Sequence, residues 1–111
     1  MKLYYIAIIF LMETATKKTT NILDFLIPEG DFDYKLRKIL SEDIKRKLIE
    51  FQIIDNRFRK KYGMTLEEFE QKNIIKEKGF SFEVESDYHE WDSAVDAIKT
   101  LKAKIEDLSK G

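Results

Sequence analysis

The sequence contains no cysteine, one proline, one histidine and four glycines among its 111 residues. Without cysteine the chain can form neither a disulfide bond nor a cysteine-ligated metal site. A zinc site of the common kind would need several carboxylates around the only histidine, His89, and a Ser-His-Asp arrangement would depend on that same residue. The scarcity of glycine and proline favours long regular elements. These absences point away from disulfide-rich, zinc-binding and hydrolytic classes of protein.

Phosphate-binding loops are absent too, because the sequence has neither a GxxxxGK[ST] nor a GxGxxG motif. We predict a non-enzymatic protein without catalytic residues, metal or cofactor, and we interpret His89 as a partly exposed residue in the first turn of a helix. Nucleic acid is not an expected partner, since four cations at a helix end are more typical of a complement to the helix dipole than of a phosphate site. These cations are Arg57, Arg59, Lys60 and Lys61.

Charge is abundant but unevenly distributed. The chain has 20 Lys and Arg against 21 Asp and Glu, a net charge of −1. Residues 31–61 hold 10 basic and 6 acidic side chains, or +4, and residues 62–111 hold 7 basic and 12 acidic ones, or −5. Segments of opposite sign can attract each other within one fold or between two copies, or either can face a charged partner.

Residues 1–30 are expected to be an apolar leader and linker. Residues 3–12 are ten consecutive apolar residues, about half of the ~20 that a membrane-spanning helix needs. Three interpretations stay open: a structured segment, a signal or membrane-surface anchor, or a disordered or non-native leader with translation starting at Met12. Residues 13–21 resemble a linker, and the state of the apolar run 22–27 is undecided by its periodicity.

Residues 31–111 are expected to form a helical interaction domain. From Ile44 to Tyr62 and from Trp91 to Leu108, apolar residues recur every three or four positions, the spacing of one helix face. We predict a mainly α fold in which two long helices, about 33–62 and 87–108, form an antiparallel hairpin.

A sharp corner is predicted directly after the first long helix. Gly63 can adopt the left-handed conformation that ends a helix. Thr65 can cap a new helix over residues 66–72, with Glu68 reaching back to the amide of Thr65 in a capping box. Ser86 or Asp87 is the expected cap of the last helix.

Strict alternation of apolar and polar residues between the short and the last helix predicts one strand-like segment, residues 80–85. A lone strand leaves backbone groups unpaired and therefore needs a mate from this chain, a second copy or a partner. Four aromatic residues lie in or near this segment: Phe80, Phe82, Tyr88 and Trp91. Because aromatic side chains often anchor interfaces, we predict that these four residues bind a partner.

Two stretches carry a resemblance to a known family. They are FRKKYGMTLEEF, residues 58–69, and FSFEVESD, residues 80–87, which precedes a helix containing Glu90 and Trp91. This pattern resembles small archaeal and bacterial proteins that are encoded beside a toxin-like gene and are regarded as antitoxins. The resemblance covers about residues 48–108 and implies the binding and neutralising of a protein partner without catalysis. Residues 1–30 lie outside it, and no DNA-binding module is evident.

We therefore expect a cytoplasmic protein-binding module, the antitoxin of a toxin–antitoxin pair, which can also form a homodimer. The alternatives are a self-associating coiled-coil scaffold and a small protein anchored at a membrane surface. Contact with a membrane is expected only if residues 3–12 are native and exposed.

Overall fold

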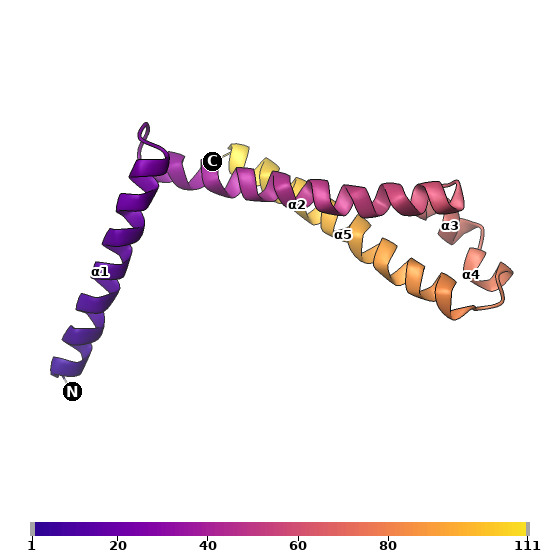
Figure 1. Cartoon of the computed structure of the whole chain (residues 1–111), viewed down its shortest axis with the longest axis horizontal. Coiled ribbons are helices and arrows are strands. Elements are labelled where there is room, and N and C mark those ends of the chain that lie inside the picture. Colours follow the sequence, from indigo (N-terminus) through magenta and orange to yellow (C-terminus); the bar gives the residue numbers. More distant parts are fainter. Residues whose placement is uncertain (1, 111) are drawn as a thin grey trace. The chain divides into compact units, whose positions relative to one another are not determined.

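A computed structural model describes residues 2–110, except the side chain of residue 15, and confirms a mainly α fold (Figure 1). Within this range the elements are α1 (Lys2–Leu26), α2 (Phe32–Tyr62), α3 (Leu66–Gln71), α4 (Ile74–Glu77) and α5 (Phe82–Lys110). The chain divides into two compact units, residues 1–39 and residues 40–111.

The first unit is formed by α1, a turn and the start of α2. Residues 13–21, expected to be a linker, belong to α1. Their threonines fit a helix because their hydroxyl groups bond back along it: Thr14 Oγ1 donates to the carbonyl oxygen of Phe10 at 3.0 Å, and Thr20 Oγ1 to that of Thr16 at 2.8 Å. A threonine- and lysine-rich composition is therefore compatible with a helix, because the hydroxyl groups bond within it.

The apolar side chains at the start of α1 are exposed. Nine of the ten residues 3–12 are large and apolar, and all nine are among the exposed hydrophobic residues of the structure. Burial in this unit begins about three helical turns later, with Leu23 and Ile27. None of the described helices combines the length and apolar character that crossing a bilayer requires.

The turn into α2 forms as its residue types suggest. Gly30 has a φ of +87°, a conformation that favours glycine, and Asp31 caps the helix by accepting a hydrogen bond from the Tyr34 amide at 2.8 Å. Lys35, only 7% exposed, forms an ion pair of 2.6 Å with Asp24 of α1. α2 then continues without a break to Tyr62.

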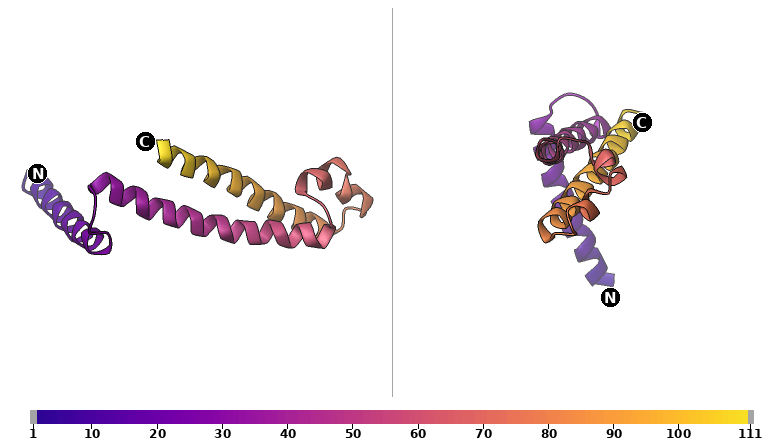
Figure 2. Two further views of the ribbon diagram at one scale, coloured as in Figure 1. Left: turned by 90° about the horizontal axis from the view of Figure 1, so that it is seen from above. Right: turned by 90° about the vertical axis from the view of Figure 1, so that its right-hand side faces the viewer.

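The predicted corner after α2 is confirmed. Gly63 has a φ of +67°, and its amide donates to the carbonyl oxygen of Arg59 at 2.8 Å. Thr65 caps α3 through a full capping box with Glu68. The hydrogen bonds to Thr65 lower the pKa of the Glu68 carboxyl. Figure 2 shows α3 and α4 between the end of α2 and the start of α5.

The predicted strand over residues 80–85 is wrong, as are the predicted caps Ser86 and Asp87. α5 begins at Phe82, and its first turn is capped by Ser81, whose Oγ accepts from the Val84 amide at 3.2 Å. A helix satisfies its backbone groups within the segment, whereas a lone strand does not. The helical register also places Val84 on the same buried face as Trp91, which the alternation in the sequence did not reveal.

The core of the second unit is an aromatic cluster at one end of α2 and α5. We define it as the buried residues Phe58, Leu66, Phe69, Ile74, Val84 and Trp91, with Ile54, Tyr62, Met64, Ile75, Tyr88 and Val95 packed around them. Away from this cluster the apolar stripes of both helices are only half-buried. The half-buried residues are Ile44, Leu48 and Phe51 on α2 and Ile98, Leu101, Ile105 and Leu108 on α5.

Candidate functional site

Trp91 lies at the centre of the aromatic cluster and is 0% exposed. Its ring stacks against Phe58 and Tyr62, with centroid distances of 5.7 and 5.8 Å, and meets Phe69 edge-on at 5.3 Å. Its indole Nε1 donates to Asp55 Oδ1 at 2.8 Å, so the one polar atom of the ring has a partner. In this structure Trp91 joins α2, α3 and α5 and offers no surface to a partner.

One side of the contact between α2 and α5 is held by ion pairs, and we call it the ion-paired flank. Lys61 Nζ lies 2.6 Å from Asp87 Oδ2 and 2.8 Å from Glu83 Oε1, and Arg57 pairs with Glu90. The charge counts allowed attraction between the basic and the acidic segment. The structure shows that α2 and α5 of the same chain form these pairs. Single exposed pairs contribute little, but a shared network of this kind fixes how the helices meet.

The electrostatics of the ion-paired flank centre on Asp87. Burial raises the pKa of its carboxyl, but the hydrogen bonds from Lys61 and from the Tyr62 hydroxyl, at 2.6 Å, outweigh that effect and leave the pKa below its ordinary value. Burial and the bond to Asp87 raise the pKa of Tyr62 to about 12. The bonds to Asp87 and Glu83 raise the pKa of Lys61. At neutral pH Asp87 and Lys61 are therefore charged in the fold, and Tyr62 is protonated and neutral.

Tyr88 lies at the edge of the cluster. Its ring stacks on Phe69 with a centroid distance of 5.9 Å, and its hydroxyl donates to Glu70 Oε1 at 2.9 Å, which raises the pKa of the Tyr88 hydroxyl. The half-buried ring reaches a small apolar groove of about 410 Å³ beside α4. Phe80 and Ile75 also line this groove.

Phe80 and Phe82 are exposed, in contrast to Trp91. Their exposed fractions are 61% and 86%. Phe80 has a φ of +56°, rare for a bulky residue, and its amide donates to the carbonyl oxygen of Ile75 at 2.9 Å. The structure thus separates the four predicted partner-binding residues: Phe80 and Tyr88 line one groove, Phe82 projects from the first turn of α5, and Trp91 is buried.

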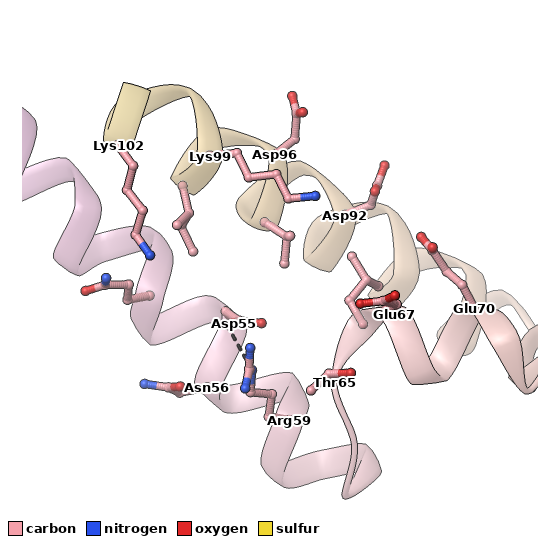
Figure 3. A pocket seen from close by; sticks show the side chains of 14 residues that line it. Asp55, Asn56, Arg59, Thr65, Glu67, Glu70, Asp92, Asp96, Lys99 and Lys102 are labelled. Carbon is pink, nitrogen blue, oxygen red and sulfur yellow. Dashed lines mark hydrogen bonds and ion pairs between the residues drawn. The ribbon is translucent and has the colours of Figure 1, made fainter. Parts of the chain in front are cut away.

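A larger groove lies between α2, α3 and α5, on the side opposite the ion-paired flank (Figure 3). Its volume is about 920 Å³. Its wall includes the apolar residues Leu66, Val95 and Ile98, and charged residues of both signs. Sequence reasoning missed this groove, although the spacing of Asp92, Asp96, Lys99 and Lys102 along one side of α5 was a usable signal.

The described residues contain no group of three or more His, Asp or Glu side chains that could hold a metal ion. His89 is exposed on α5 and contacts the ring of Tyr88, at a centroid distance of 5.8 Å. Comparison of the chain with protein-family models, with curated proteins and with solved structures found no match.

Proposed function

We propose that this chain is a non-enzymatic protein-binding module that contacts its partner through Phe80 and Phe82. The observation that carries the proposal is the pair of exposed phenylalanines, 61% and 86% accessible, beside an apolar groove. Aromatic side chains are enriched at the buried centres of protein interfaces. Burying both rings against a partner would remove a large apolar area from water.

The backbone at Phe80 supports the same surface. Phe80 has a φ of +56°, a conformation that is costly for a residue other than glycine, and its ring is exposed. Such conformations persist where the surrounding structure enforces them, and they cluster at binding sites. Here the hydrogen bond to Ile75 holds the Phe80 amide in place.

The partner we propose is the toxin of a toxin–antitoxin pair. The resemblance of residues 48–108 to antitoxin-like proteins supports this choice, and it covers the segment that carries Phe80 and Phe82. In this proposal α2 and α5 form an antiparallel helical hairpin that presents the segment between α4 and α5 at one end. Neutralisation needs only a stable complex, so no catalytic group is required.

Co-expression with the product of the neighbouring gene tests the proposal. The expected result is rescue of a growth defect that the neighbour causes alone, together with co-purification of the two chains. Phe80→Ser and Phe82→Ser should each weaken the complex, because each removes an exposed ring and leaves every buried residue of the cluster in place.

Ile53→Ser is the matched control, since Ile53 is also 61% exposed but lies on α2. It should leave rescue and co-purification unchanged. A harmless neighbour that forms no complex with the parent chain would contradict the proposed function. A complex that tolerates both phenylalanine changes would contradict the assigned surface.

Self-association is the second candidate function, and the half-buried stripes favour it. The apolar residues of α2 between 44 and 51 and those of α5 between 98 and 108 are covered less well than the aromatic cluster. Their spacing on α5 is that of a coiled-coil seam. A second copy of the chain could cover them, and the discriminating result is a stable oligomer in light scattering with no complex with the neighbour.

A further inference from the structure

The two sides of the contact between α2 and α5 differ in how their charges are used. On the ion-paired flank, cations of α2 meet carboxylates of α5. On the groove side, the side chains of Asp92, Lys99 and Lys102 take part in none of the ion pairs and hydrogen bonds found among the described residues. Helical periodicity explains the contrast, because residues 87 and 90 project from one side of α5 and residues 92 and 99 from the other.

The charged side chains that α5 contributes to the groove are sorted by sign along its length. Along α5, Asp92 and Asp96 come first, near α3, and Lys99 and Lys102 follow (Figure 3). The acidic end holds Glu67, Glu70, Asp92 and Asp96, and the basic end holds Lys99 and Lys102. Arg59, at the acidic end, is paired with Asp55. From residue 92 to residue 102 the rise along α5 is about 15 Å, or roughly three helical turns.

The groove also has an apolar patch, and it is anchored to the core. Leu66, Val95 and Ile98 supply its apolar surface. Asp55 lies at its base, where Arg59 pairs with Asp55 at 3.0 Å and Trp91 donates to the other carboxylate oxygen. The base of the groove is therefore preorganised by the same cluster that holds α2, α3 and α5 together.

We propose that this groove binds an amphipathic helix of the protein partner. The apolar face of that helix would lie on Leu66, Val95 and Ile98, its Lys or Arg residues at the acidic end, and its Asp or Glu residues about three turns away at Lys99 and Lys102. Charge complementarity fixes both the occupant and its direction. A helix fits because the groove has no sheet edge to pair with an extended chain, and a helix satisfies its own backbone groups.

This inference rests on the proposed function, since it assigns the same protein partner a second contact, in the groove between α2, α3 and α5. The test measures binding of the purified product of the neighbouring gene by calorimetry. Lys99→Glu and Lys102→Glu should each weaken binding by about tenfold at low salt, and the loss should shrink as salt is raised. Lys104→Glu is the matched control, because it makes the same charge change at an exposed position of α5 outside the groove.

Circular dichroism should show all three variants folded, since the replaced side chains are exposed. Loss of affinity in both groove variants with parental affinity in Lys104→Glu supports the inference. Equal affinities in the three variants and the parent, with a complex still formed, overturn the groove inference alone. Failure of the parent chain itself to bind overturns both this inference and the proposed function.

Discussion

At the scale of single residues, Asp87 connects two parts of the second unit. It accepts hydrogen bonds from Lys61 and from Tyr62, while the ring of Tyr62 stacks on Trp91. The carboxylate therefore links the ion-paired flank to the aromatic cluster. Because these bonds favour the charged form, the pKa of Asp87 is lower in the folded chain than its ordinary value of 3.8.

This pKa shift predicts a pH dependence of stability. A carboxylate with a lowered pKa contributes stability above its ordinary pKa and loses it as the pH falls through the lower, folded value. The melting temperature of the parent should therefore fall below about pH 4, while Asp87→Asn should melt lower than the parent at pH 7 and lose less on acidification. Thermal melts followed by circular dichroism from pH 7 to pH 3 measure both effects.

Asp107→Asn is the control for this pH series, because Asp107 is an exposed carboxylate of the same helix. It should reproduce the parental curve. Parallel curves for the parent and Asp87→Asn would mean that Asp87 does not couple protonation to folding.

At the scale of elements, the corner between α2 and α3 depends on the backbone of Gly63. A Cβ atom at this position would meet nothing within 4 Å, so a larger residue has room. What opposes it is the φ of +67°, since a left-handed conformation costs an L-residue roughly 1–2 kcal/mol. Conformation alone therefore explains why glycine suits this site.

Gly63→Val should destabilise the chain by about 1 kcal/mol or more, because a β-branched residue resists positive φ. Gly63→Asn should cost less, since asparagine tolerates this region better than other residues do. Urea titrations of the three proteins give the comparison. Equal stabilities for Val and Asn would show that the left-handed conformation of Gly63 does not limit stability.

At the scale of the whole molecule, the second unit is held firmly at one end. Phe58, Trp91 and Ala94 are buried, whereas apolar residues farther along both helices are half-covered. Local opening should therefore be easiest far from the aromatic cluster, because fewer apolar contacts oppose it there.

Hydrogen exchange should reveal this gradient in the second unit. We expect the slowest amide exchange in residues 58–62 and 88–95 and faster exchange in residues 40–48 and 101–108. Measuring at two protein concentrations separates the single chain from an oligomer. Uniform protection along α2 and α5 at low concentration would contradict a core confined to the aromatic cluster.

The sequence by itself determined the features that depend on neighbouring residues. Helical spacing predicted α2 and most of α5, and local backbone chemistry predicted the stop at Gly63 and the capping box of Thr65 and Glu68. These predictions succeed because propensity, capping and positive φ are set within about one helical turn.

Only the tertiary structure decided which aromatic residues are buried and where the groove lies. Phe82 and Val84 alternate like strand residues, yet Val84 enters the core because the helix places it on the face of Trp91, and Phe82 stays in solvent. The large groove is formed by α2, α3 and α5 together. The sequence alone therefore does not show that its charged residues lie near one another. Burial and charge clustering arise from contacts between distant segments, and local patterns cannot specify them.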